Sequence, residues 1–389
     1  MKMLQELVNE FIKTFGEEPQ GNYFAPGRVN LIGEHTDYNG GNVFPCALTI
    51  GTYMIARKRE DKLIRLYSKN FSELGVLEFS VDDLKNEKEH DWANYSKGVI
   101  WALRENGYTI DSGFEGYVYG NIPNGAGLSS SASLELVTGV TLRDLFKLNV
   151  DMIDLVKFSQ LAENKFIGVN CGIMDQFAIG MGKENCATLL DTNTLKYSYA
   201  PINLVDSSIV ISNTNKRRGL ADSKYNERRG QCEAALKDLQ KEVKINALGE
   251  LSEEEFEKYK HLIVDEINRK RAKHAVYENV RTLKAVEALK NNEVELFGKL
   301  MNASHVSLRD DYEVTGIELD TLVELAWKQE GVIGSRMTGA GFGGCTVSLV
   351  KNKDIDNFIK NVGEAYKEKI GYEADFYVVN IGDGARRLD

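Results

Sequence analysis

The sequence predicts an α+β protein made of two mixed α/β domains, and three observations support this fold class. Strand-like and helix-like segments alternate through the first 205 residues. Helix-forming and charged residues then dominate from about residue 220 to residue 300, and glycine almost disappears between residues 250 and 296. Strand-like segments return near the end of the chain. We therefore expect an N-terminal domain over residues 1–205 and a helix-rich C-terminal domain over residues 206–389.

The individual elements follow from the spacing of apolar residues. Strands rich in Val, Ile, Phe and Tyr are expected at 21–31, 43–57, 63–68, 75–80, 114–121, 207–212, 345–350 and 375–380. Helices of the N-terminal half are expected at 3–15, 92–107, from about 131 to 147, and from 151 to 165. Gly107 is suited to end the second of these helices, and Asp151 to cap the start of the fourth.

Composition and charge exclude several classes of protein. The chain has 389 residues, of which 42% are hydrophobic and 27% charged, as in ordinary globular proteins. A net charge of −10 argues against a general nucleic-acid or acidic-membrane binder. No apolar run is long enough for a transmembrane helix, and the first 15 residues lack the apolar core of a signal peptide. The five cysteines are widely spaced, without a Cys-x-x-Cys pair, so we expect reduced thiols in a cytoplasmic protein. No obligatory protein partner is evident.

The most informative segment is residues 25–41, Ala-Pro-Gly-Arg-Val-Asn-Leu-Ile-Gly-Glu-His-Thr-Asp-Tyr-Asn-Gly-Gly. It places Arg28, Glu34, His35 and Asp37 between two apolar runs, with glycines that permit tight turns. One interpretation is a polar pocket for a hydroxyl-rich ligand, in which the guanidinium binds an anion. The other is a buried salt-bridge cluster that braces a turn, because ion-pair networks also gather charges. The segment alone leaves both open.

A second motif, Pro-Asn-Gly-Ala-Gly-Leu-Ser-Ser-Ser-Ala-Ser, follows the expected strand 114–121 and begins a helix. Glycines let the backbone approach a ligand, consecutive N–H groups can bind an anion, and the helix N-terminus adds partial positive charge. A helix cap would need only one of the serines, so the run favours a phosphate-binding loop. The Lys of a Walker A loop is absent.

Two further motifs complete the set. In residues 168–177 a lone carboxylate, Asp175, lies among apolar residues and could act as a general base for a sugar hydroxyl, or could cap a helix. Glu163 on the preceding helix could supply a second carboxylate, although a solvated helix face is the simpler interpretation.

Residues 339–344 match G-x-G-x-x-G, but a strand follows instead of a helix, which excludes a dinucleotide fold. Spacing does not decide whether this glycine loop contacts a ligand or packs against a neighbouring loop.

Together these motifs resemble the GHMP small-molecule kinases and, among them, the galactokinases. Residues 27–41 look like the galactokinase signature, and residues 123–132 match the superfamily phosphate motif P-x-x-x-G-L-x-S-S-A. The glycine loop matches the third superfamily motif. The segments Cys-Gly-Ile-Met-Asp-Gln at 171–176 and Ser-Lys-Tyr at 223–225 also resemble galactokinases. The resemblance implies a GHMP-kinase-like fold with the active site between the two domains.

The resemblance also implies an activity: ATP-dependent phosphorylation of galactose at the anomeric C1 hydroxyl, giving galactose 1-phosphate and ADP, with Mg²⁺ bound. This is the first step of galactose breakdown by the Leloir pathway. Asp175 and Arg28 correspond to the catalytic residues, and Ser131 and Glu163 to the magnesium ligands. The implied sugar contacts are Glu34, His35, Thr36, Asp37, Gly172 and Tyr225. The implied nucleotide contacts are Ser68, Gly125, Ala126, Gly127, Leu128, Ser129, Ser130 and Ser131.

Three alternatives remain beside this expectation. The chain could act on N-acetylgalactosamine or arabinose, because the pocket residues do not decide tolerance at the sugar 2-position. It could be a galactose sensor that binds sugar and ATP without turnover, but residues 129–132 are intact, which favours an enzyme. A structural protein with a decayed site is disfavoured by the presence of Arg28 and Asp175.

Overall fold

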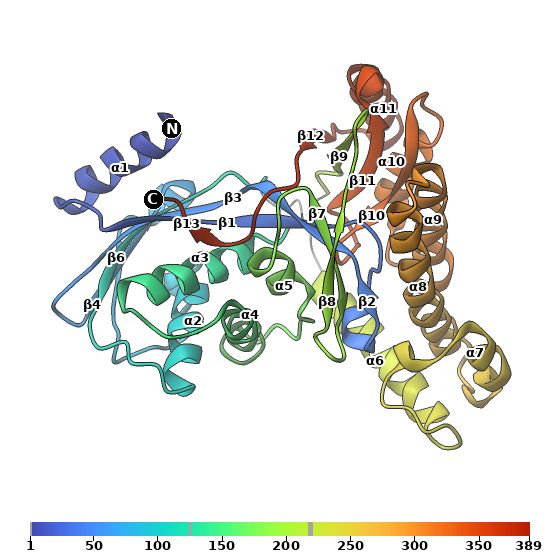
Figure 1. Ribbon diagram of the computed structural model, residues 1–389, viewed down its shortest axis with the longest axis horizontal. Helices are drawn as coiled ribbons and strands as arrows, with labels where there is room; N and C mark the ends of the chain where they lie inside the picture. Colours follow the sequence, from blue (N-terminus) through green and yellow to red (C-terminus); the bar gives the residue numbers. More distant parts are fainter. Residues whose placement is uncertain (1, 124–126, 217–220) are drawn as a thin grey trace.

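The structure is a computed structural model that describes residues 2–123, 127–216 and 221–389. Gly125 and Ala126, two of the expected phosphate-loop residues, lie outside the described residues. Helices and strands gather into two lobes that lie side by side (Figure 1). Among the described residues, no helix combines the length and apolarity needed to cross a bilayer.

The N-terminal lobe is built on a six-stranded sheet with the order β13-β1-β3-β6-β4-β5. All neighbouring strands are antiparallel except β4 and β6, which are parallel. The strands are β1 (Gly21–Asn30), β3 (Pro45–Lys58), β4 (Leu63–Ser68), β5 (Leu77–Ser80), β6 (Phe114–Gly120) and β13 (Arg386–Arg387).

Helices cover both faces of this sheet (Figure 1). Met54 and Ala56 of β3 join a core with four helices, whereas Ile55 points the other way and packs against α1, as strand alternation requires. The helices on the first face are α2 (Ala93–Glu105), α3 (Ser130–Leu145), α4 (Met152–Leu161) and α5 (Met174–Gly180), and α1 is Lys2–Phe15. Asp151 caps α4 as expected, because its side chain accepts a hydrogen bond from the backbone N of Asp154 at 2.8 Å.

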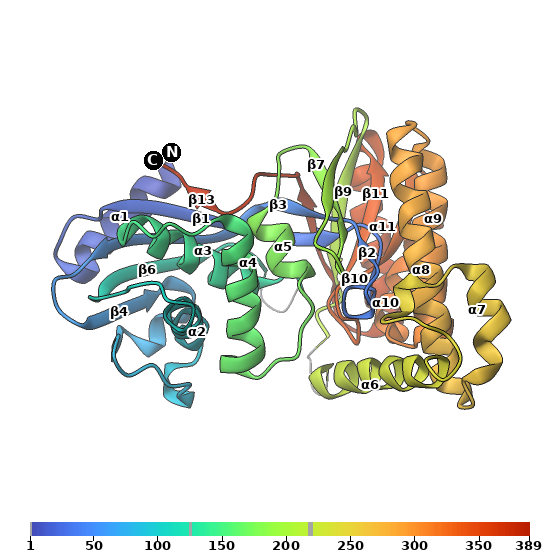
Figure 2. The ribbon, with the colours of Figure 1, turned by 60° about the horizontal axis from the view of Figure 1, so that its bottom comes forward.

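The C-terminal lobe has an antiparallel four-stranded sheet with the order β10-β11-β9-β12. Helices α8 and α9 pack on one face, and α10 and α11 on the other (Figure 2). The strands are β9 (Ser207–Asn213), β10 (Val332–Thr338), β11 (Cys345–Lys351) and β12 (Asp375–Val379). The helices are α6 (Ala221–Leu239), α7 (Glu253–Tyr259), α8 (Glu266–Lys290), α9 (Val294–Ser307), α10 (Gly316–Ala326) and α11 (Ile355–Ile370).

A third, three-stranded sheet has the order β2-β7-β8 and consists of β2 (Asn42–Val43), β7 (Cys186–Asp191) and β8 (Tyr197–Pro201). The predicted α+β class is confirmed, and most expected elements appear within a few residues of their predicted limits. The sequence analysis missed the strands β7, β8, β10 and β13 and the helices α5, α10 and α11, and it did not separate β2 from β3. The division at residue 206 stays a prediction, and β13 shows that the end of the chain returns to the N-terminal sheet.

Candidate functional site

An arginine and a carboxylate meet in a two-pronged ion pair at the centre of the site. The Arg28 guanidinium donates from Nε to Asp175 Oδ1 at 2.8 Å and from Nη2 to Asp175 Oδ2 at 2.6 Å. The strand β1 delivers Arg28 just after an irregularity in its pairing with β3, and α5 delivers Asp175 in its first turn. The Arg28 side chain is 5% exposed and that of Asp175 32%, so the carboxylate remains accessible. This geometry holds the pair in one orientation.

Arg28 also anchors the predicted phosphate loop. Its Nη1 donates to the Gly127 carbonyl at 2.8 Å, and its backbone N donates to the Leu128 carbonyl at 3.1 Å. A side chain at Gly27 would come within 2.9 Å of that Leu128 carbonyl, which explains the glycine there. Burial opposes the charge of Arg28, but the Asp175 carboxylate outweighs it and raises the arginine's pKa. Arg28 is therefore a permanent cation beside the loop.

The three serines at 129–131 lie in different surroundings. Ser129 adopts a left-handed backbone conformation, with φ of 60°, and its hydroxyl donates to Asp175 Oδ2. Ser130 begins α3 and is exposed, and Ser131 follows in the first turn. The N-terminus of a 16-residue helix therefore lies next to the Arg28–Asp175 pair.

Glu163 lies in a π-helical turn, η4 (Ala162–Ile167), and is buried. Ser131 Oγ donates to its Oε1 at 3.3 Å, and Gln176 Nε2 donates to its Oε2 at 2.7 Å. Burial, together with the nearby charge of Asp175, raises the pKa of Glu163 to about 7. Gln176 also donates to the fully buried Glu135 at 3.1 Å. The two expected magnesium ligands are thus in contact, with a second carboxylate behind them.

Glu34 connects the sugar-signature segment with the C-terminal lobe. Its Oε1 accepts hydrogen bonds from Gly339 N at 2.7 Å, Thr338 Oγ1 at 3.0 Å and Arg336 Nη1 at 3.4 Å. Arg336 is fully buried and also donates to the backbone carbonyl of Asn30 at 3.0 Å. The glycine loop at 339–344 therefore packs on the sugar-signature segment. The sequence spacing alone had not decided whether this loop packs against a neighbouring segment.

Asp37 and Gly172 meet closely. A side chain at Gly172 would overlap the Asp37 carboxylate, so this position requires glycine. Burial, then the neighbouring carboxylates of Asp175 and Glu34, raise the pKa of Asp37 to about 7. These acidic groups form a polar surface suited to hydroxyl groups.

The other expected sugar and nucleotide contacts take separate places. Thr36 is fully buried, and its Oγ1 lies 2.9 Å from the Gly33 carbonyl and 2.7 Å from the Asn42 carbonyl, which braces the turn. The Tyr225 ring of α6 lies 5.7 Å from the His35 ring. Ser68 is buried at the end of β4, beside β6, the strand that leads toward the serine run. No contact between Ser68 and residues 127–131 is found in the described part of the chain.

Sequence reasoning missed several residues of this region. Tyr38 is within the signature segment and could have been found there, because it follows Asp37 directly. Gln176 could also have been found, because it ends the quoted segment 171–176 directly after Asp175. Arg336, Tyr312 and His274 carried no local signal, since their partners lie far away in the sequence.

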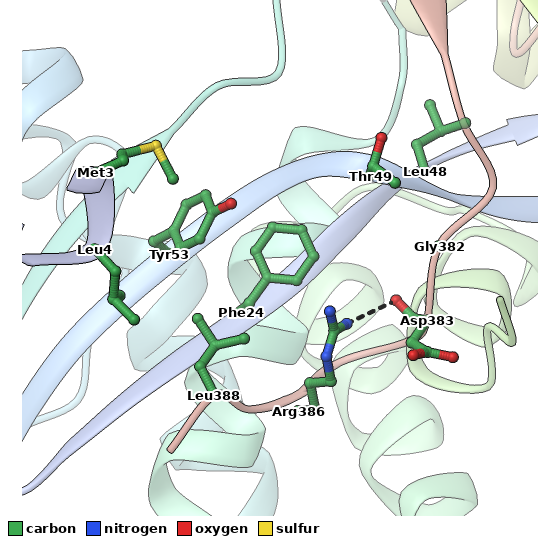
Figure 3. Close-up of a pocket in the computed structure, with 10 residues that line it drawn as sticks. All are labelled: Met3, Leu4, Phe24, Leu48, Thr49, Tyr53, Gly382, Asp383, Arg386 and Leu388. Atoms are coloured by element: carbon green, nitrogen blue, oxygen red, sulfur yellow. Dashed lines mark hydrogen bonds between the residues drawn. The ribbon is translucent and has the colours of Figure 1, made fainter. Parts of the chain in front are cut away.

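Two surface pockets differ in whether expected site residues line them. One, of about 420 Å³, is lined by Asp37 and Gly172 and by amide side chains, including Asn164 and Asn170. Figure 3 shows another, of about 250 Å³, between α1, β3 and the C-terminal segment, into which Phe24, Tyr53 and Arg386 point. None of the expected site residues that the structure describes lines this second pocket. The first pocket is lined by two of the expected sugar contacts, Asp37 and Gly172, and therefore lies on the sugar side of the candidate site.

The arrangement combines the parts that phosphoryl transfer needs. A fixed cation, a helix N-terminus and a serine loop can neutralise phosphate charge, while an accessible carboxylate beside them can receive a proton. Acidic and imidazole groups next to that carboxylate can bind an alcohol-rich acceptor.

Comparisons with known proteins agree with this chemistry. Three family models match: the galactokinase galactose-binding signature over residues 9–58, the GHMP kinases N terminal domain over 94–183, and the GHMP kinases C terminal model over 285–368. A galactokinase from Clostridium beijerinckii is 66% identical over 388 residues, covering 100% of both chains.

Comparison with solved structures supports the same family and fold. The crystal structure of Lactococcus lactis galactokinase complexed with galactose is 54% identical, with a TM-score of 0.97, and the match covers 99% of this chain and 100% of that one. The mevalonate kinase of Methanococcus jannaschii has a TM-score of 0.66 at 18% identity, covering 93% of this chain and 98% of that one. This second likeness concerns the fold alone, and it supports the expected GHMP-kinase-like fold.

Proposed function

Because the chain belongs to the galactokinase family of the GHMP kinases, we propose that Arg28 and Asp175 form the centre at which it phosphorylates galactose. As a member of that family it acts as a galactose kinase and uses ATP. The finer assignment is that the terminal phosphoryl group of ATP passes to the anomeric C1 hydroxyl, giving galactose 1-phosphate and ADP. The two-pronged Arg28–Asp175 pair beside the serine run carries this assignment.

The reaction demands charge neutralisation and alignment more than covalent chemistry. The C1 oxygen bonds to the terminal phosphorus as the bond to the ADP oxygen breaks, and Asp175 accepts the hydroxyl proton. Arg28 is buried and permanently charged, so it can offset charge on the transferred group without reorganising. Its bond to the Gly127 carbonyl aligns the loop with the acceptor.

The sugar side of the site follows from the acidic surface described above. Asp37 and Tyr225 lie within electrostatic reach of Asp175, Gly172 lies against the Asp37 carboxylate, and the His35 ring lies 5.7 Å from the Tyr225 ring. We assign these four residues to the hydroxyl groups of galactose. Glu34 contributes on this side by joining the sugar segment to the glycine loop through Gly339. Closing these contacts around the sugar would exclude water from the reacting oxygen.

A magnesium ion fits beside the serine run. Ser131 and Glu163 face one another at 3.3 Å, a long hydrogen bond that an ion between the two oxygens could replace. Mg²⁺ favours one or two protein oxygens, with water and phosphate oxygens completing its shell. When bound, the ion would neutralise charge on the ATP phosphates. Ser131 and Glu163 would hold it, and Gln176 would fix the orientation of Glu163.

A coupled assay of ADP release tests this function. Purified protein with MgATP should turn over with galactose, and the comparison set is N-acetylgalactosamine, glucose, arabinose and mevalonate. Asp175→Asn should reduce kcat by about 10²–10⁴-fold, because a positioned proton acceptor contributes that much. Calorimetry should show that Asp175→Asn still binds galactose. ADP release that galactose does not stimulate would overturn the assignment, and loss of both folding and binding would mean that Asp175 only braces the turn.

A further inference from the structure

Helix α8 presents a row of polar side chains to the sugar-signature segment. His274, Glu278 and Thr282 lie one helical turn apart and are fully buried, so they share one face of the helix. His274 Nε2 lies 3.1 Å from the Glu34 carbonyl oxygen, and Gly33 N donates to Glu278 Oε1 at 3.0 Å. A side chain at Gly33 would come within 2.9 Å of Thr282 Oγ1. The helix therefore lies directly against the turn that leads into Glu34.

The backbone at Gly33 bends sharply, and Glu278 receives its N–H. Gly33 has φ of 93°, a conformation that favours glycine, and a side chain there would come within 2.7 Å of the Asn42 carbonyl. The residue is buried, and a buried backbone N–H requires an acceptor. The carboxylate of Glu278 is that acceptor. A residue of the C-terminal lobe thus fixes the bend directly before Glu34.

A second route connects Glu278 with the side chain of Glu34. Glu278 Oε1 also accepts from Ser304 Oγ at 2.5 Å, and Ser304 Oγ accepts from Arg336 Nε at 3.2 Å. Arg336 Nη1 donates to Glu34 Oε1 at 3.4 Å. The direction of each bond is fixed, because a guanidinium can only donate and an ionised carboxylate can only accept. Glu278 therefore holds the backbone before Glu34 and, through two further side chains, the Glu34 carboxylate.

The carboxyl group of Glu278 is ionised although it is fully buried. Its Oε2 accepts from Arg281 Nη1. Burial opposes the charge, but the surrounding positive charge, first that of Arg281, outweighs burial and lowers the pKa of Glu278 to about 2. Anions and cations therefore alternate from α8 through Arg336 to Glu34. Loss of one member would leave its neighbour as a buried charge without that partner, which is costly.

The position of Glu34 affects both halves of the site. Glu34 is only 1% exposed, and its charge is felt at Arg28 and at Asp37. Its Oε1 also accepts from Gly339 N at 2.7 Å in the glycine loop. A displaced Glu34 carboxylate would therefore change the electrostatic field on the sugar side of the site and loosen the contact between the two lobes.

We propose that Glu278 is a positioning residue for galactose phosphorylation. It holds the Gly33 backbone directly and the Glu34 side chain through Ser304 and Arg336. The C-terminal lobe thereby sets the geometry of the sugar-signature segment, and loss of Glu278 should weaken galactose binding more than nucleotide binding. The inference rests on the function proposed above.

Glu278→Gln tests this role, because it removes the charge at nearly unchanged size. Calorimetric titration should show that the Kd for galactose rises about 10-fold, as weakened hydrogen bonds to a charged group imply. The KM for ATP should change less than about 3-fold, because both contacts of Glu278 lead to the sugar-signature segment. A role in folding alone would lower the urea midpoint and leave the Kd of the folded protein unchanged, and that result would overturn the proposal.

Glu115→Gln is the matched control. Glu115 of β6 is 1% exposed and pairs with Arg59 at 2.7 Å and Arg65 at 2.9 Å in the N-terminal sheet. This substitution also removes a buried carboxylate from a group of arginines, so it should lower the urea midpoint. The Kd for galactose should change less than about 2-fold, because the control acts at an independent place. An equal rise in Kd for both variants would contradict a specific role of Glu278.

Ser304→Ala isolates the route through Arg336. It leaves the bond from Gly33 N in place, and it keeps the proposal testable where Glu278→Gln fails to fold. The Kd for galactose should rise about 5-fold in the otherwise unchanged protein. In a Glu34→Gln background the same substitution should raise it less than about 2-fold, because residues of one hydrogen-bond network do not act additively. Equal effects in both backgrounds would refute the route to Glu34.

Binding and turnover separate this inference from the proposed function. ADP release by the wild type decides whether galactose is phosphorylated, whereas the Kd for galactose is measured without turnover. Wild-type protein that phosphorylates galactose, together with an unchanged Kd in both Glu278→Gln and Ser304→Ala, would refute the positioning role alone. Wild-type protein that binds galactose without ADP release, with a raised Kd in both variants, would refute the proposed function and support the hold of Glu278 on the sugar-signature segment.

Discussion

Three non-glycine residues of the site hold left-handed backbone conformations: His35, Ser129 and Phe342, with φ between 59° and 61°. Such conformations cost free energy and persist where surrounding contacts determine them. Ser129 is held by its bond to Asp175, and Phe342 by its backbone N, which donates to the Val314 carbonyl at 2.7 Å. One strained residue thus lies in each of the three motifs, the sugar signature, the serine run and the glycine loop.

At the residue scale, Asp37 should make stability depend on pH. Its pKa is about 7 in the folded protein and near 3.8 when unfolded, so the folded state binds the proton more tightly. Stability is therefore full below pH 4 and falls as the pH rises toward 7. The Asp37→Asn substitution removes the ionisable carboxyl group and with it this loss of stability at higher pH. The variant should gain about 1 kcal/mol relative to wild type between pH 6 and pH 8, measured by urea unfolding without ligand.

Asp61→Asn is the control for this measurement. Its bond to Arg59 lowers the pKa of Asp61 to about 2, so both of its relevant pKa values lie below pH 6. The difference between Asp61→Asn and wild type should not change between pH 6 and pH 8. An equal lack of trend for Asp37→Asn would show that its carboxylate is not destabilised by burial.

At the element scale, glycines set how closely helices approach strands. A side chain at Gly298 of α9 would fall on the carbonyl of Ile333 in β10, and one at Gly334 would lie 2.6 Å from the Gly298 Cα. The pair lets α9 lie against the strand that carries Arg336 toward Glu34. The packing of α9 against β10 therefore helps to position Arg336 beside Glu34, although it lies outside the site.

The close contact between α9 and β10 predicts that substitutions at two glycines have opposite effects on the free energy of unfolding. Gly298→Ala should lower the free energy of unfolding by about 1–3 kcal/mol, because the added methyl group has no space. Gly230→Ala, inside α6 where nothing lies within 4 Å of the added carbon, should raise it by about 0.5–1 kcal/mol. Chemical denaturation measures both. Equal effects would contradict the close contact between α9 and β10.

One of the missed elements, β10, shows a physical reason why sequence reasoning failed. The strand β10 contains Gly334 and the buried cation Arg336, which interrupt the apolar pattern expected of a core strand. Arg336 is tolerated there only because Glu34 and the Asn30 carbonyl accept from it. By contrast, β3 keeps an apolar face along most of its length, and its predicted limits are close to the observed ones.

At the scale of the whole molecule, the last residues return from the C-terminal lobe to the first sheet, and both termini lie close together (Figures 1 and 2). The short strand β13 pairs with β1, and Leu388 N donates to the Asn22 carbonyl at 2.8 Å. Arg387 Nη1 lies 2.6 Å from Asp144 Oδ2 on α3. The end of the chain thus leaves the C-terminal lobe and packs on the N-terminal lobe.

Removing residues 386–389 should lower the free energy of unfolding by about 2–3 kcal/mol, since a few backbone bonds and a partly exposed ion pair are lost. The truncated protein should keep its kcat at low temperature, because the hydrogen bonds and ion pairs of this segment involve none of the site residues that the structure describes. Deleting Asp389 alone, whose contacts to Asn22 are exposed, should cost less than about 0.5 kcal/mol. Thermal unfolding followed by activity separates the cases, and an unaltered melting temperature would show that β13 adds no stability.

The sequence alone determined which motifs are present, because glycine spacing, serine runs and clustered charges are local properties. It also determined the strands and helices with regular apolar spacing, and with them the fold class. Only the tertiary structure decided which charges meet: Arg28 and Asp175 are 147 residues apart, and Glu34 and Gly339 are 305 apart. Pairing over such distances depends on how sheets and helices pack, which no local pattern encodes. The same holds for Tyr38 and Tyr312, whose hydroxyls lie 2.7 Å apart although the residues are 274 positions apart.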